Sequence, residues 1–248
     1  MAARQIIDGK VEFLMSSQLG GMRAAKYYIH QSWLEEAKAY KGKLSILAIK
    51  ETEKKFAKRE ALRQAFRGMP HAKIVFLMKE STAALKFEQM HYQDLYYVEL
   101  LSAKPHGKVM ESHLLMSFLH ALIKHHNIAF RYVLRATTPK AFDMHQKLFS
   151  SIGSAKLVPP TDYVTTRCNT GNPIIRNPEN PWFLPHEQLP DQKYYPVYAQ
   201  MPFFLSRKAS ECLADTLNTT LIPFEDVNVG WFLESQCKIL CTEWTTGQ

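Results

Sequence analysis

The stretch that decides the fold is KLSILAI at residues 43–49, followed by EKKFAKREALRQAF at 53–66 and KIVFLM at 73–78. The first and third pieces are short apolar runs bounded by charged residues, which is typical of buried strands. The middle piece is longer, basic and helical in its pattern. Together they predict a strand, a helix and a second strand in succession, the repeating unit of an α/β protein.

The same alternation continues toward the middle of the chain. A third strand is expected at Tyr96–Leu101, a helix at Lys108–His125 and a fourth strand at Phe130–Leu134. The predicted helix carries Leu114, Leu115, Phe118, Leu119 and Leu122 on one side, which indicates an apolar face. An α/β/α sandwich is therefore the expected fold class.

The second half of the chain has a different character. After about Ser154, prolines crowd a region rich in Asn and aromatic residues, so loops and short strands should dominate there. Helical patterns return at Lys208–Leu217 and again where Pro223 begins a helix that runs past Trp231. The expected fold thus has an irregular, Pro-rich C-terminal half.

Length and composition favour one folded domain. With 248 residues, 46% of them apolar, the chain can bury a substantial core. We expect a single domain over residues 41–248 and an added helical segment over residues 1–40, with its helix at Ala24–Tyr40. No apolar window is long enough for a spanning helix and the first ten residues lack the core of a signal peptide, so the sequence as given predicts a soluble chain without an anchor.

The net charge and the cysteine spacing limit the partners and metal sites to be expected. The net charge of +8 favours an anionic partner such as a phosphate or nucleotide. No zinc finger, RNP motif or Gly-rich basic stretch accompanies it, so we expect no nucleic-acid partner. Four cysteines (Cys168, Cys212, Cys237 and Cys241) show no CxxC spacing, which argues against structural zinc and leaves disulfides or buried thiols open.

Two groups of charged residues are candidates for ligand binding or catalysis. In the predicted helix at 53–66, Arg59 and Arg63 are four residues apart and share one face, where they could meet a diphosphate or simply face solvent. In LIPFEDVNVGW at 221–231, Glu225 and Asp226 stand at a predicted helix start. They could supply a catalytic base, or merely stabilise the helix N-terminus by their charge.

Several segments resemble, in order, the inverting β-1,3-glycosyltransferases of glycosyltransferase family 31. PFEDVNVG (223–230) resembles the family's C-terminal acidic signature, and KREALRQAF (58–66) its basic segment after the first strand. Further likenesses are FEQMHYQDL (87–95), PIIR with PWF (173–176 and 181–183) and YPVY (195–198). They extend from about residue 43 to residue 233, some three quarters of the chain.

The resemblance implies a GT-A-like nucleotide-sugar-binding fold and a hexosyltransferase of the β-1,3-galactosyltransferase type. Such an enzyme transfers a sugar from a UDP-sugar donor to a hydroxyl of a glycan or glycoprotein acceptor, with inversion. Asp226 matches the proposed base, with Glu225 beside it. The resemblance also implies a Golgi membrane protein with a lumenal catalytic domain, and a partner glycosyltransferase is a further expectation.

The chain departs from the family pattern at the metal site. The family's fourth strand runs into three aspartates that hold a divalent ion such as manganese, whereas this chain has Thr137-Thr138-Pro139. Hydroxyls and a proline bring no charge to a hard cation, so we expect no metal site of the usual kind. The donor diphosphate would then be neutralised by Arg59, Arg63, Arg135 and Lys140.

A second departure lies in YAQMPFFLS (198–206), where the family's glycine-rich turn is missing and Met201 and Phe203 should reshape the pocket. These losses support an alternative function, a catalytically inactive glycosyltransferase-like protein that binds a glycan or acts as a chaperone. Histidines recur at positions 106, 113 and 120, but a spacing of seven is too long for two of them to share a metal ion easily.

Overall fold

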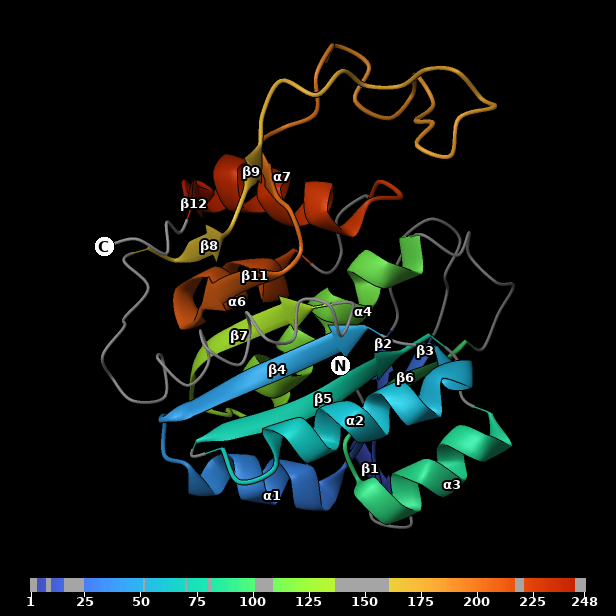
Figure 1. The fold of residues 1–248 in the computed structure, drawn as a ribbon, viewed down its shortest axis with the longest axis vertical. Coiled ribbons are helices and arrows are strands. Elements are labelled where there is room, and N and C mark those ends of the chain that lie inside the picture. Colours follow the sequence, from blue (N-terminus) through green and yellow to red (C-terminus); the bar gives the residue numbers. More distant parts are fainter. Residues whose placement is uncertain are drawn as a thin grey trace.

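A computed structural model describes residues 4–7, 10–15, 25–50, 52–69, 71–79, 82–100, 109–136, 161–216 and 221–243. Most of its strands form one large mixed sheet, with helices on both faces (Figure 1). The strand order in this sheet is β1-β2-β3-β6-β5-β4-β7-β11-β8-β12. The mixed α/β class that the sequence predicts is confirmed.

The centre of the sheet is a set of four parallel strands. They are β4 (Leu44–Lys50), β5 (Ala72–Met78), β6 (Leu95–Leu100) and β7 (Phe130–Ala136). The chain moves outward from β4 through β5 to β6, then returns and adds β7 on the other side of β4. Each of these strands overlaps the segment predicted for it. Strand β4 is buried from Leu44 to Ile49, as its unbroken apolar run requires.

Helices cover the two faces of the sheet in chain order. On one face, α2 (Phe56–Phe66), preceded by the 3₁₀ turn η2 (Glu53–Lys55), and α3 (Ala83–Tyr92) pack on β5 and β6. On the other lie α1 (Gln31–Ala39), α4 (Val109–His120) with the π-helical η3 (Ala121–His125), α6 (Arg207–Asp215) and α7 (Glu225–Cys237). The result is the three-layer sandwich expected from the alternating pattern.

The N-terminal residues differ from the prediction. In place of a helical segment, β1 (Arg4–Ile7), β2 (Lys10–Met15) and β3 (Ala25–His30) form an antiparallel extension that joins the main sheet at β6. Tyr27 and Ile29 are buried at a spacing of two, and the ring of Tyr28 stacks on Tyr97 at 4.9 Å. This alternation of aromatic and branched residues suits a strand, so the helix expected over Ala24–Tyr40 begins only at Gln31.

On the other side, the sheet ends in short strands from the C-terminal half. Strand β11 (Phe203–Ser206) lies antiparallel to both β7 and β8 (Tyr163–Thr165), and β12 (Thr242–Glu243) pairs with β8. Strands β9 (Cys168–Asn169) and β10 (Tyr198–Ala199) form a separate pair. Phe203, expected to reshape the pocket, is fully buried against Tyr163 and belongs to the core.

Between β9 and β10, the Pro-rich segment 170–197 has almost no regular structure, as expected. Its apolar residues pack with the N-terminal part of α7 in a small core of their own, made of Ile174, Leu184, Leu189, Ile222, Phe224 and Val227. The side chain of Arg176 holds this segment together. It donates hydrogen bonds to the backbone carbonyls of Leu184, Pro185, Gln188 and Leu189. The segment extends away from the sheet above α7 (Figure 1).

Helix α7 contacts this unit through Gly230. A Cβ atom on Gly230 would lie 2.2 Å from the carbonyl oxygen of Val197 and 2.8 Å from Cα of Tyr198, both backbone atoms. A residue with a Cβ atom would clash with the backbone of β10 and the residue before it, so glycine is required for this close approach.

Substituting Gly230 tests the contact. Alanine in a free helix would be favoured over glycine by about 1 kcal/mol. At this position we expect Gly230→Ala instead to lower the free energy of unfolding by about 2 kcal/mol through overpacking. The thermal midpoint should fall by about 6 °C, while the exposed Gln236→Ala in the same helix changes little. A higher midpoint for Gly230→Ala would contradict the packing described.

Candidate active site

The candidate site lies where the order of the parallel strands reverses. Strands β5 and β6 lie on one side of β4 and β7 lies on the other, so β4 and β7 flank a topological switch point. In open α/β sheets ligands bind at the carboxyl ends of the strands at such a point. Lys50 ends β4, Ala136 ends β7, and Lys79 follows β5 at the same edge. This edge therefore carries cationic side chains.

A buried ion pair brings the start of α7 to this edge. Nε of Arg135 donates to Oε1 of Glu225 at 2.5 Å, and its Nη2 donates to Oε2 at 2.9 Å. Nη1 donates to the carbonyl of Ala48 on β4 at 3.2 Å. Both side chains are almost completely buried. Bidentate geometry of this kind fixes orientation as well as distance, so the pair anchors the first turn of α7 over β4 and β7.

Asp226, the next residue, faces the site with a perturbed carboxyl group. Burial is the main cause that raises the pKa of Asp226 to about 6, and the negative charge of Glu225 adds to it. A hydrogen bond from the Val227 amide at 3.0 Å and the positive charge of Lys50 act in the opposite direction. At neutral pH the group is a carboxylate that readily accepts a proton, as a general base requires.

The charge of Asp226 reaches three tyrosines. Burial raises the pKa of Tyr163, Tyr195 and Tyr198, and the charge of Asp226 contributes to each increase. Tyr163 accepts a hydrogen bond from the Ala199 amide, and Tyr198 accepts one from Nδ2 of Asn172. Tyrosines from β8, β10 and the Pro-rich segment thus lie within range of the charge of Asp226.

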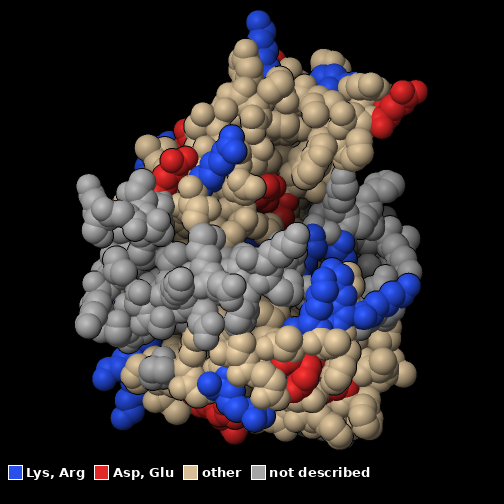
Figure 2. Space-filling view, viewed as in Figure 1, with Lys and Arg blue, Asp and Glu red and all other residues tan. Residues whose placement is uncertain are grey.

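The surface shows how these parts are arranged. Figure 2 shows acidic side chains in a recess below the Pro-rich segment, with Lys and Arg side chains on the opposite side of the recess. Such a juxtaposition of acidic and basic side chains suits a ligand with an anionic part and a reacting hydroxyl.

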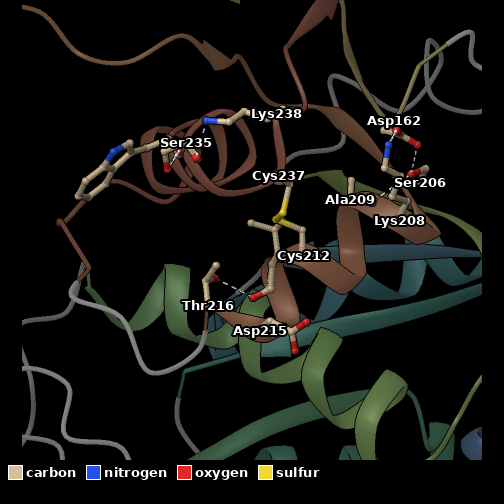
Figure 3. Close-up of a disulfide and its surroundings, with 12 residues drawn as sticks. Asp162, Ser206, Lys208, Ala209, Cys212, Asp215, Thr216, Ser235, Cys237 and Lys238 are labelled. Carbon is tan, nitrogen blue, oxygen red and sulfur yellow. Dashed lines mark hydrogen bonds and ion pairs between the residues drawn. A yellow bond between two sulfur atoms is a disulfide. The ribbon is translucent and has the colours of Figure 1, made fainter.

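Two further contacts hold α7 in position. The buried Asn228 donates to Oγ of Ser112 and to the carbonyl of Ile222, and it accepts from the Ile222 amide. At the other end of the helix, a disulfide joins Cys237 to Cys212 on α6 (Figure 3). A second disulfide joins Cys168 to Cys241, so all four cysteines are paired. Helix α7 is thus fixed at its start, along its length and at its end.

The structure places Arg59 and Arg63 in a network away from the site. Arg59 is buried and donates to both carboxylate oxygens of Glu88 and to the carbonyl of Thr52. Arg63 donates to Asp94 and Glu88. These guanidinium groups hold α2 to α3 and to the start of β6, and Arg135 is committed to Glu225. The sequence suggests that Arg59 and Arg63 contact a diphosphate or face solvent. In the structure they form this buried network instead.

Lys140 and Thr137-Thr138-Pro139 lie outside the described residues. Among the described residues, no three His, Cys, Asp or Glu side chains gather as metal ligands. His113 is buried against the hydroxyl of Tyr27, and Nδ1 of His120 lies 3.0 Å from the carbonyl oxygen of Ala214. Likewise, no helix in the described part of the chain is long and apolar enough to cross a bilayer.

A cavity of about 440 Å³ lies away from Asp226. It opens at the beginning of β5, between α1 and α2, and Trp33, Phe66, Lys73 and Tyr92 are among its lining residues. Its two acidic side chains are held in ion pairs, Glu36 with Lys73 and Asp94 with Arg63. Because the cavity is at the amino ends of the strands and its carboxylates are paired, we place the candidate site at Asp226.

Sequence reasoning missed Lys50 and Asn228. Lys50 is the polar residue that ends the first apolar strand, a position that points to the ligand edge once a parallel sheet is assumed. Asn228 follows the acidic pair inside a helical pattern, where asparagine is a poor helix former and therefore signals a specific contact.

No protein-family model matches this chain, and no curated protein matches it.

The ion pair can be tested by replacing either partner. Arg135→Met should leave the carboxylate of Glu225 buried without a counter-charge and lower the free energy of unfolding by about 3–5 kcal/mol. The double variant Arg135→Met, Glu225→Leu should recover much of that loss, because neither charge remains buried. Urea unfolding of the single and double variants measures both values. Additive losses in the double variant would show that the two side chains do not interact.

The pKa of Asp226 has a consequence for stability. Because its folded-state pKa of about 6 exceeds the ~3.9 of an unfolded chain, its stabilising effect is complete below about pH 4 and is lost as pH rises through 6. Asp226→Asn cannot ionise, so it should raise the thermal midpoint by a few degrees at pH 7.5 and by almost nothing at pH 4. The exposed Asp191→Asn should show no such trend. An equal effect of Asp226→Asn at both pH values would contradict the raised pKa.

Proposed function

We propose that this protein is an inverting hexosyltransferase of the β-1,3-galactosyltransferase type, with a GT-A-like fold. It transfers a sugar from a UDP-sugar to a hydroxyl of a glycan or glycoprotein. The observation that carries the proposal is the carboxylate of Asp226, with its raised pKa, at the ligand edge of a doubly wound sheet. The collinear resemblance to glycosyltransferase family 31 supports it, because the same residue matches that family's base.

The chemistry assigned to the site is a single displacement. Asp226 accepts the proton of the acceptor hydroxyl while that oxygen attacks the anomeric carbon of the donor sugar. The bond from this carbon to the diphosphate breaks on the opposite face, so the configuration inverts and UDP leaves. Glu225 takes no part in the proton transfer, because its carboxylate is held by Arg135. Its role is to position the helix that carries Asp226.

Cations must stabilise the departing diphosphate. We assign this role to Lys50 and Lys79 because they stand at the carboxyl ends of β4 and β5. The usual metal ligands are absent from the sequence at Thr137-Thr138-Pro139, so the residues present do not fit manganese at that position. No step of the proposed reaction runs through a metal.

Both disulfides support a location in the secretory pathway. Paired cysteines persist in oxidising compartments and are rare in the cytosol. We therefore retain the Golgi lumen, which the family resemblance implies, as the proposed location.

One observation favours a second function, that of an inactive glycosyltransferase-like binding or chaperone-type protein. Three of the four cations expected at the diphosphate are instead structural ion-pair partners, and the metal carboxylates are replaced. In this function the fold would bind a glycan or a partner glycosyltransferase without transferring sugar.

Binding of UDP separates the two functions. We expect UDP at about 100 times its dissociation constant to stabilise the protein by about 2.7 kcal/mol, with or without manganese. Lys50→Ala should reduce this thermal shift, whereas the exposed Lys58→Ala on α2 should retain it. A wild-type protein indifferent to UDP would support the binding function.

Transfer itself tests the base. Asp226→Asn should keep the UDP-induced shift and lower kcat by about 10²–10⁴-fold, the range for loss of a general base. Wild-type kcat/KM should fall as pH drops below about 6. Full transfer activity in Asp226→Asn would overturn the assignment of the base.

A further inference from the structure

Trp182 is an unusually exposed aromatic residue close to the candidate base. Its side chain is 57% exposed, although its ring also lies against Phe224, with centroids 5.3 Å apart and an interplanar angle of 37°. Phe224 is buried and directly precedes Glu225 and Asp226. A large apolar surface kept in water beside a reacting group is typical of a binding surface.

The backbone of Trp182 is fixed in place. Its amide donates to Oδ1 of Asn180 at 2.8 Å, and its carbonyl accepts from the hydroxyl of Tyr195 at 3.2 Å. The surrounding segment is held by the four carbonyl contacts of Arg176. The ring is therefore presented by a pre-organised loop, which lowers the entropy lost when a ligand binds.

Aromatic contacts form a wall from Trp182 through Phe224, which lies two residues before the base, to Tyr195. The ring of Tyr195 meets Phe224 edge-on, with centroids 5.8 Å apart. Tyr195 and Tyr198 both lie close enough to Asp226 for its charge to act on their hydroxyls. The polar groups of this wall are phenol hydroxyls and the amide of Asn172, so they suit uncharged hydroxyl groups of a ligand.

We propose that Trp182, Phe224 and Tyr195 form the acceptor-binding platform, on which the apolar C–H face of a pyranose ring stacks so that a hydroxyl of the acceptor reaches Asp226. This inference rests on the proposed function for its assignment to the acceptor side. The ring of Trp182 supplies apolar area at little cost in conformational entropy, and the tyrosines and Asn172 fix the orientation of the sugar. The ligand class is a neutral saccharide ending in a hexopyranose.

The experiment compares Trp182→Ala and Trp182→Phe with Tyr194→Ala. Tyr194 is a matched control, because it lies in the same segment and is also 57% exposed. Kinetics with N-acetyllactosamine as acceptor should show a KM at least tenfold higher for Trp182→Ala. The donor KM and the UDP-induced thermal shift should stay within twofold. Trp182→Phe should restore most of the acceptor affinity, and Tyr194→Ala should behave as wild type.

A direct measurement of saccharide binding tests the platform independently of the proposed transfer reaction. Saturation-transfer NMR with methyl β-galactoside and N-acetyllactosamine should show strongest saturation at H-3, H-4 and H-5 of galactose, which share one face, and Trp182→Ala should abolish it. If wild type binds these saccharides through Trp182 but transfers no sugar, the proposed function fails and the platform stands. Absence of saccharide binding by wild type, preference for an unglycosylated peptide, or an equal effect of Trp182→Ala on donor and acceptor would overturn the platform.

Discussion

The ion pair between Arg135 and Glu225 is the interaction on which the candidate site depends. It connects the end of a central parallel strand to the first turn of a helix ninety residues later in the chain. Burial of two opposite charges is costly unless their hydrogen bonds are well satisfied, and here the guanidinium group also reaches the carbonyl of Ala48. The pair therefore specifies one position for α7, and Asp226 takes its place at the sheet edge as a consequence.

Much of the fold follows from local patterns in the sequence. The strand at Leu44–Lys50 is an unbroken apolar run, and the helix after it has the expected period, so both could be predicted from neighbouring residues alone. The strand at Ala25–His30 is not predicted, because its short alternation of buried residues fits equally into a longer helical stretch. Periodicity over six residues is a weak signal beside a helix that follows without a break.

The site was harder to predict than the fold, because long-range pairing decides the role of each charge. Asp226 could be identified from its motif, but the motif does not reveal that Glu225 is neutralised from β7. Arg59 and Arg63 share a helix face as predicted, yet Glu88 and Asp94 arrive from a later helix and strand to bury them. Trp182 lies in a segment that resembles the family, PWF, but its exposure could not be predicted, since it depends on how a segment without regular structure is folded around Arg176.

The Arg135–Glu225 pair also constrains how this sequence can evolve. Loss of either residue alone leaves a buried charge, so a lineage that changes one must pass through a destabilised intermediate unless the other changes as well. The two positions should therefore vary together among homologues, in contrast to the exposed Lys58 of α2, which can change independently. Distant relatives could then be aligned by this correlated pair, with β7 and the start of α7 as fixed reference points.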